Sequence, residues 1–283
     1  MDIMTYYSAE VNKALADSVQ GENRLHEAMR YALLSGGKRI RPVLMLAVLD
    51  AYGYPWKQYI SVALSIEYIH TYSLIHDDLP AMDDDALRRG KPTTHIAFDE
   101  ATAILAGDAL LTDAFSLISE DTVLSAHEKV QLIQILATRA GSKGMVYGQV
   151  LDLHYEGASV TQAVLESIHH HKTAKLIEAP LMMASVIANE RDIKVWESIG
   201  KTLGLAFQIQ DDVLEVISDE KMMGKSLSDV RNEKSTYVRL LGIKEARLKV
   251  DEMFSKVKSL VRGLDVNVDV IDGIVESVKK RLN

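Results

Sequence analysis

The chain has 283 residues, of which 47% are hydrophobic and 25% are charged, and its net charge at pH 7 is −8. This excess of acid excludes a nucleic-acid-binding protein, because phosphate backbones favour an excess of Lys and Arg. The chain has no cysteine, which excludes disulfides and thiolate chemistry. We recognise no signal peptide and no run of about 18–20 apolar residues, so we expect a cytoplasmic protein without a membrane span.

Apolar residues recur at three- and four-residue spacing from Leu25 onward, which predicts helices along almost the whole chain. Helices are predicted over residues 24–35, 42–51, 56–79, 95–118, 126–155, 160–189, 192–217, 234–262 and 266–282. We find no convincing strand pair, flexible linker or repeat of fixed period. The pattern predicts one all-α domain, residues 1–283. Its central helices, such as the segment 62–75, are expected to be buried on most faces and to direct polar ends into a cavity.

Five aspartates lie between Asp77 and Asp85, directly after the predicted helix 56–79. Pro80 should end that helix near Asp78, at the negative end of the helix dipole, where bare carboxylates are disfavoured. A solvated acidic loop is one interpretation. A divalent-cation site is the other, because Mg²⁺ prefers carboxylate oxygens. The turn at Pro80 removes the objection that Asp77 and Asp83 lie on different helix faces.

A second acidic group favours the cation site. Gln208, Asp211 and Glu215 share one face of the predicted helix 192–217, and Asp212 follows Asp211 among apolar neighbours. Buried acids need a partner or a metal ion. We therefore expect two carboxylate clusters, at the ends of two central helices, to face each other across the cavity.

Basic residues accompany these acids, and they suit phosphate groups. Arg88 and Arg89 follow the first cluster directly, and arginine forks match phosphate oxygens in pairs. Lys38 and Arg41 lie at a predicted helix start after two glycines, a setting that suits an anion. The remaining candidates for a ring of cations are Lys172, Lys225 and Lys234.

Five segments in this order, GGKRIRP, LIHDDLPAMDDDALRRGKPT, GMVYGQVLDL, HHKT and FQIQDDVLE, resemble the trans-isoprenyl diphosphate synthases. The likeness covers about Leu25 to Leu241 and is nearest to the bacterial-type farnesyl diphosphate synthases. It implies the isoprenoid synthase fold, an all-α bundle of about ten helices around a central cavity, and a homodimer. It also implies a Mg²⁺-dependent prenyltransferase. The implied reaction is head-to-tail (1'-4) condensation of isopentenyl diphosphate with dimethylallyl or geranyl diphosphate, giving farnesyl diphosphate. A geranylgeranyl diphosphate synthase is the alternative within the family.

The resemblance also implies roles for individual residues. It implies three Mg²⁺ ions, for which Mn²⁺ is a substitute, near Asp77, Asp78, Asp83, Asp211, Asp212 and Glu215. The residues implied for the allylic diphosphate are Arg88, Lys172, Gln208, Lys225 and Lys234. Those implied for isopentenyl diphosphate are Lys38, Arg41, His70 and Arg89. Lys172, Thr173 and Gln208 are the implied catalytic residues.

The position five residues before Asp77 resembles the one that limits chain length in the family. Tyr72 occupies it here, and a bulky aromatic residue suits a C15 product. The alternative is an ordinary buried tyrosine, with Tyr68 one turn below as the real stop. Three departures from the family pattern are Ala86, Tyr147 and Glu215, of which Glu215 stands where a third aspartate is usual.

A different class of protein shares one feature of the sequence. Glu67-x-x-His70 and Glu166-x-x-His169 match the pattern of di-iron carboxylate bundles. That interpretation leaves both aspartate clusters and the arginines without a purpose. A non-catalytic helper subunit would be expected to lose the aspartates, and a terpene cyclase would not need the basic residues of an isopentenyl site.

Overall fold

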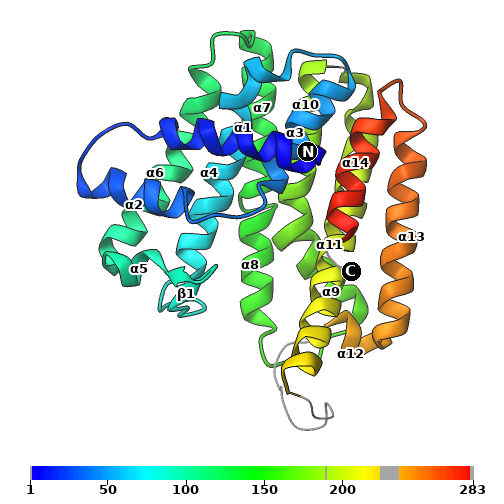
Figure 1. Ribbon diagram of the computed structural model, residues 1–283. Helices are drawn as coiled ribbons and strands as arrows, with labels where there is room; N and C mark the ends of the chain where they lie inside the picture. Colours follow the sequence, from blue (N-terminus) through cyan, green and yellow to red (C-terminus); the bar gives the residue numbers. More distant parts are fainter. Residues whose placement is uncertain (1, 189, 224–235, 281–283) are drawn as a thin grey trace.

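The computed structural model describes residues 2–188, 190–223 and 236–280, and they form a bundle of helices (Figure 1). The α-helices are α1 (Ile3–Ser18), α2 (Arg24–Leu33), α3 (Ile40–Ala51), α4 (Ile60–Asp77), α5 (Thr94–Ala97), α6 (Glu100–Ser119), α7 (Ala126–Ala140), α8 (Met145–His154), α9 (Gln162–His169), α10 (Lys175–Ala188), α11 (Ile193–Met223), α12 (Tyr237–Leu241), α13 (Ile243–Val261) and α14 (Val268–Lys279). Short 3-10 helices are η1 (Trp56–Tyr59) and η3 (Glu190–Asp192), and η2 (His170–Ala174) is a π-helical turn. The expectation of an all-α protein is confirmed.

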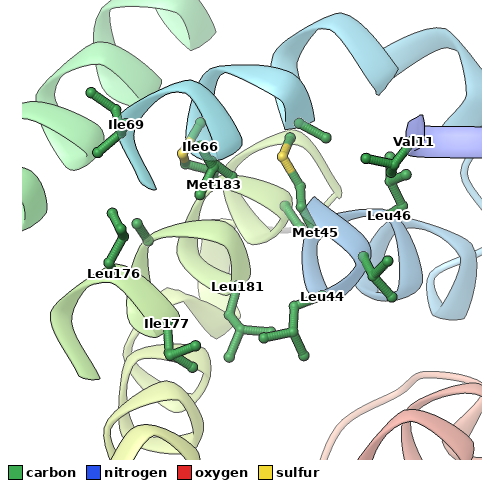
Figure 2. Close-up of a cluster of buried hydrophobic side chains, with 14 of the residues drawn as sticks. Val11, Leu44, Met45, Leu46, Ile66, Ile69, Leu176, Ile177, Leu181 and Met183 are labelled. Carbon is green, nitrogen blue, oxygen red and sulfur yellow. The ribbon is translucent and has the colours of Figure 1, made fainter. Parts of the chain in front are cut away.

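Helices α3, α4 and α10 form the centre of the bundle, as expected from their apolar sequences. Figure 2 shows side chains of all three helices meeting in one buried cluster, among them Met45 of α3, Ile66 of α4 and Met183 of α10. These three side chains are fully buried. Burying one such side chain stabilises the fold by roughly 1.5–3 kcal/mol. The cluster therefore provides a rigid base for the helix ends that carry polar residues.

Glycines bring α11 close to the elements before it. A Cβ atom at Gly200 would lie 2.6 Å from the Cα of Glu178, and one at Gly204 would lie 2.5 Å from the Cα of Ala174. Any larger residue at either position would separate the helices. The close approach sets the next turns of α11, which carry Gln208 and Asp211, beside η2.

The structure differs from the sequence-based prediction in its local breaks. Helix α1 was not predicted, although Tyr7, Val11 and Leu15 form a buried stripe at four-residue spacing. The predicted helix 126–155 is divided into α7 and α8, because the chain turns between Gly141 and Gly144. The predicted helix 160–189 contains the π-helical turn η2. Gly141 and Gly144 are a local signal for the break between α7 and α8, whereas no glycine or proline marks η2.

One strand pair is present, contrary to expectation. Strand β1 (Leu87–Arg88) pairs antiparallel with β2 (Lys91–Pro92). Each strand has two residues, too few for a periodic pattern to be visible in the sequence.

The expectation of a chain without a membrane span is not confirmed. Within the described part of the chain, α6 is the one helix that is long and apolar enough to cross a membrane. Length and composition are weak evidence, since the core helix of a soluble protein passes the same test. Part of the apolar surface of α6 is open, because Ile104 is 43% and Leu105 is 58% exposed.

Candidate active site

The first aspartates lie at the end of α4, as predicted. The helix stops at Asp77, and Asp78 caps it. After the turn at Pro80 the chain comes back, so that the backbone N–H of Asp83 donates to the carbonyl oxygen of Asp77 at 2.9 Å. Burial raises the pKa of the Asp77 carboxyl, and the nearby Asp83 carboxylate raises it further. The structure therefore brings Asp77 and Asp83 together at the mouth of α4.

Asp78 is engaged differently from Asp77. Its Oδ1 atom accepts from Arg88 Nε at 2.6 Å and lies 2.5 Å from Arg88 Nη2. The Asp78 residue is only 3% exposed. The pair therefore fastens β1 to the end of α4 and holds the hairpin beside Asp77.

The hairpin turn directs the second arginine. Arg89 (φ 53°) and Gly90 (φ 76°) both have positive φ, as the two central residues of a type I′ turn require. The Arg89 guanidinium donates to the carbonyl oxygen of Gly36. A Cβ at Gly37 would lie 2.5 Å from Arg89 Nη1. The glycine pair before α3 is therefore needed for Arg89 to reach this loop.

Beside Arg89, the start of α3 and the middle of α4 supply further cationic or neutral nitrogen donors. Arg41 Nε is buried and has no hydrogen-bond partner among the described residues. Burial lowers the pKa of Arg41 to about 10, an effect that Glu67 opposes and Arg89 reinforces. Burial and the charge of Arg41 lower the pKa of His70 well below its usual value, so this imidazole is neutral at pH 7. Lys38 is exposed on the loop that leads into α3. A buried guanidinium nitrogen without a hydrogen-bond partner, close to another arginine, suits an anion.

Lys172 and Thr173 lie on the π-helical turn η2. Lys172 Nζ is 2.6 Å from Asp152 Oδ2 of α8. Burial lowers the pKa of Lys172, but Asp152 and Asp77 more than offset this and raise it overall. The Thr173 hydroxyl donates to Gln208 Oε1 of α11 at 2.9 Å. Lys172, Thr173 and Gln208 are therefore adjacent, and Lys172 is charged close to the first acidic cluster.

Two residues of this site received no role from sequence reasoning. Gln149 Nε2 donates to Asp77 Oδ1, and Asp152 pairs with Lys172. The signal was present, since Gln149 and Asp152 are two polar residues one turn apart on an otherwise apolar helix. Helix α8 reaches η2 because Gly148 has no side chain. A Cβ there would lie 2.0 Å from the backbone nitrogen of Lys172.

The second acidic cluster lies on α11. Asp211 is partly buried, and its charge raises the pKa of Arg41, which places it within electrostatic reach of the basic group. Asp212 is 7% exposed, and its Oδ2 accepts from the backbone N–H of Tyr237 at 2.9 Å. This bond anchors the start of α12. The side chain of Glu215, together with Lys225 and Lys234, lies outside the described residues.

The carboxylates fit Mg²⁺ as ligands, although the described residues contain no group of three or more His, Cys, Asp or Glu side chains that alone would hold a metal ion. Mg²⁺ typically binds through one or two carboxylates and completes its shell with water and substrate phosphates. Asp77 and Asp83 on one side and Asp211 on the other supply carboxylates of that kind. The donor set is consistent with ions that are held jointly by protein and substrate.

The departure at Tyr147 has little effect on the site. This residue is 42% exposed, and its ring packs edge-on against His171 with centroids 5.1 Å apart. The side chain is therefore accommodated at the surface.

The di-iron interpretation finds no support in the structure. Glu67 is paired with Arg39 at 2.6 Å, and Glu166 is paired with Lys249 at 2.8 Å. Burial lowers the pKa of His169 to about 4 without any carboxylate hydrogen bond to it. Both glutamates therefore serve as partners of cations.

The bundle thus carries one aspartate cluster at the end of α4, a second within α11, and basic residues near both, a donor set that suits cations and phosphate groups. The chain belongs to the polyprenyl synthetase family, whose model matches residues 22–265. The expected nearness to the bacterial farnesyl diphosphate synthases is confirmed. The chain is 46% identical over 275 residues to the farnesyl diphosphate synthase of Micrococcus luteus, covering 96% of this chain and 94% of the relative.

Other relatives differ in their product. The chain is 39% identical to geranylgeranyl pyrophosphate synthase 7 of Arabidopsis thaliana, a chloroplastic protein, over 96% of this chain and 81% of the relative. Among solved structures, a geranyltransferase of Helicobacter pylori in complex with magnesium and isoprenyl diphosphate has a TM-score of 0.84 and 37% identity. That comparison covers 99% of this chain and 97% of the other.

Proposed function

We propose that the chain condenses isopentenyl diphosphate with dimethylallyl and then geranyl diphosphate and releases farnesyl diphosphate. The observation that supports this proposal is the presence of two groups of cations with different neighbours. Lys172 of η2 and Arg88 of the hairpin are close enough to Asp77 to oppose the rise in its pKa, whereas Arg41 at the start of α3 is close to Arg89 and Glu67. One active site of this kind accommodates two diphosphates.

The allylic diphosphate is assigned to the side of Lys172. In this assignment Arg88, Lys172 and Gln208 contact it, together with Lys225 and Lys234. Asp77, Asp83 and Asp211 would hold three Mg²⁺ ions, or Mn²⁺ in their place, which neutralise charge on the departing diphosphate. The bonds of Asp78 to Arg88 and of Asp212 to the Tyr237 backbone favour positioning roles for these two acids. Glu215 is kept as a third ligand position on α11.

Isopentenyl diphosphate is assigned to Lys38, Arg41, His70 and Arg89. The unpaired Arg41 Nε and the neutral His70 supply hydrogen-bond donors, and Lys38 and Arg89 supply charge from the two flanking loops. The two assignments have no cation in common. Each substrate therefore has its own cations.

The residues then act in a defined order. Breaking the allylic carbon–oxygen bond moves negative charge to the diphosphate, where Lys172 stabilises it. The oxygens of Thr173 and Gln208, 2.9 Å apart, point their negative dipoles at the allylic cation. C4 of isopentenyl diphosphate forms the new carbon–carbon bond, and a proton leaves its C2. The released diphosphate takes that proton, so no side chain has to act as the base.

We assign chain-length control to Tyr72. This side chain is 7% exposed on α4, with its ring packed edge-on against His76 at a centroid distance of 5.7 Å. Among the described residues its hydroxyl has no hydrogen-bond partner, whereas the Tyr68 hydroxyl donates to Ser18 at 2.8 Å. Tyr72 is therefore held by packing alone beneath the first aspartates. A C20 product is the alternative outcome.

We further propose that the chain is a single catalytic domain and acts as a cytoplasmic homodimer. One continuous core cluster extends from Tyr7 to Val278, which supports a single domain. Leu105 of α6 is 58% and Val130 of α7 is 64% exposed, on two helices that contact each other. A second copy of the chain would cover this apolar surface.

Product analysis tests the proposed reaction. Purified protein is incubated with Mg²⁺, isopentenyl diphosphate and either dimethylallyl or geranyl diphosphate, and the dephosphorylated products are separated by chromatography. Farnesol from both primers supports the proposal. Geranylgeraniol as the main product would favour the C20 alternative, and the absence of any product from both primers would overturn the proposal.

A further inference from the structure

Arg39 is a strained residue in the loop that leads into α3. Its φ of 54° lies in the left-handed region, which residues other than glycine seldom adopt. It is the N-cap residue of α3 and only 4% exposed. Strain of this kind persists only where the surrounding structure enforces it. The residue stands between Lys38 and Arg41, two members of the proposed isopentenyl site.

The guanidinium of Arg39 makes contacts that enforce this conformation. Its Nη1 donates to Glu67 Oε1 of α4 at 2.6 Å, and its Nη2 donates to the Leu33 carbonyl oxygen at the end of α2 at 2.6 Å. Its Nε donates to Asn12 Oδ1 of α1 at 2.8 Å. One planar group therefore ties the loop to three helices. The side chains of the Arg39–Glu67 pair are 2% and 3% exposed, so water does not compete for it.

Arg39 and its hydrogen-bond partners hold the loop that carries part of the proposed isopentenyl site. Residues 34–39 include the two glycines on which Arg89 rests. Arg39, Asp84 and Arg89 are the three non-glycine residues with positive φ in the described chain, and two of them belong to this place. Glu67 also precedes His70 by three residues on α4.

The Arg39–Glu67 pair also affects Arg41 through the charge of Glu67. Glu67 is close enough to Arg41 to raise its pKa, yet the carboxylate is bonded to Arg39. Arg41 Nε is left without a hydrogen-bond partner among the described residues. Arg39 thus occupies the carboxylate that would otherwise compete with an anion for Arg41.

We propose that Arg39 and Glu67 are positioning residues for isopentenyl diphosphate: their buried pair sets the loop geometry that aims Lys38 and Arg41 at the diphosphate. Neither side chain contacts the substrate. The inference rests on the proposed assignment of Lys38, Arg41, His70 and Arg89 to that site. It gives the Glu67-x-x-His70 motif a function other than metal binding.

Arg39→Gly is the most direct test, because glycine adopts the left-handed conformation without strain and leaves a space lined by Asn12, Leu33 and Glu67. We expect the KM for isopentenyl diphosphate to rise about tenfold or more, with the KM for geranyl diphosphate nearly unchanged. Millimolar guanidinium ion should partly restore the KM in Arg39→Gly and leave the wild-type protein unaffected. Added guanidinium ion can restore the KM only if it binds in the space that the Arg39 guanidinium occupied.

Three further variants separate the possible outcomes. Tyr7→Phe removes the bond from Tyr7 to Asp50 between α1 and α3 without touching the loop, and should leave both KM values unchanged. Arg39→Lys and Glu67→Gln should raise the same KM, and they carry the test if Arg39→Gly does not fold. Equal losses for both substrates, in proportion to the loss of thermal stability, would overturn the proposal.

The assigned site is checked independently with Lys38→Ala. A raised KM for isopentenyl diphosphate in Lys38→Ala, with no such change in the Arg39 and Glu67 variants, would overturn the positioning role while the site stands. No change in Lys38→Ala would instead overturn the site assignment on which the inference rests. A raised KM in both sets supports both.

Discussion

His170 Nε2 lies 2.7 Å from Glu178 Oε1, and this contact closes the π-helical turn that carries Lys172 and Thr173. Glu178 has no exposed surface, and Lys175 Nζ reaches it as well, at 3.0 Å. The buried carboxylate therefore anchors both ends of the turn. This turn places Lys172 beside Asp152 and Thr173 beside Gln208.

Glu178→Gln should destabilise the protein, because it leaves buried cations without their partner. Arg139 Nε also lies 3.1 Å from this carboxylate. Removing one partner of a buried pair typically costs about 3–5 kcal/mol. Urea unfolding followed by circular dichroism measures the change. Glu197→Gln is the matched control, since Glu197 contacts the same arginine at 2.5 Å but is 40% exposed, and it should cost less than about 1 kcal/mol. Equal effects of the two variants would show that Glu178 is no anchor.

Activity should depend on Mg²⁺ and on the carboxylates assigned to it. A chelator should abolish turnover, and added Mg²⁺ should restore it. Asp77→Asn and Asp211→Asn should each lower kcat by several orders of magnitude while helix content remains, because charge on the departing diphosphate is no longer neutralised. Asp84→Asn is the control, since Asp84 is exposed and was not assigned to the site. Turnover near the wild-type level in Asp77→Asn would refute the ligand assignment.

Arg89→Ala and Lys172→Ala should affect different substrates. Arg89→Ala removes ground-state binding, so the KM for isopentenyl diphosphate should rise while kcat changes little. Lys172→Ala removes stabilisation of the leaving group, so kcat should fall. Steady-state kinetics with each substrate varied in turn distinguishes the two effects. If both variants shift one parameter for one substrate, the two-site partition is wrong.

Stability should fall as the pH drops from about 6.5 towards 4, partly because of His169. Burial lowers the pKa of this imidazole to about 4, so the folded state keeps it neutral while the unfolded chain binds a proton below about pH 6.5. A group with a lowered folded pKa stabilises the fold above its unfolded pKa, and that stability is lost as the pH falls. The loss should be about 3 kcal/mol between these pH values. Urea unfolding of wild-type and His169→Gln protein at several pH values measures it, with the exposed His154→Gln as control. An unchanged pH slope in His169→Gln would contradict the assignment.

Tyr72→Ala should lengthen the product. The truncation opens space below the first aspartates, so the main product should shift from farnesyl to geranylgeranyl diphosphate and longer chains. Chromatography of the dephosphorylated products decides this. Tyr68→Ala tests the other candidate, whose hydroxyl is bonded to Ser18. A C15 product from active Tyr72→Ala together with longer products from Tyr68→Ala would move the stop to Tyr68.

The sequence by itself determined the helical class and the end of α4, and it predicts the chemistry of the site. Apolar spacing depends on local geometry, and Pro80 removes a backbone hydrogen bond and clashes with the preceding turn, which favours the end of the helix before it. Clustered aspartates favour cations and clustered arginines favour phosphates, whatever the surrounding fold. These properties belong to short segments, and the structure confirms the helical class and places the end of α4 at Asp77.

Only the tertiary structure decided which of these charged groups are bonded to other groups of the protein. Asp78 and Asp77 are neighbours in one motif, yet one is bonded to Arg88 and the other faces Lys172 and Gln149. Arg39 and Glu67 are 28 residues apart, and nothing local in either segment indicates their pairing. Such contacts depend on the orientation of side chains from helices that meet only in the folded bundle. The free energy of the whole fold selects these contacts, and it depends on elements that are distant in the sequence. A short segment therefore does not reveal them.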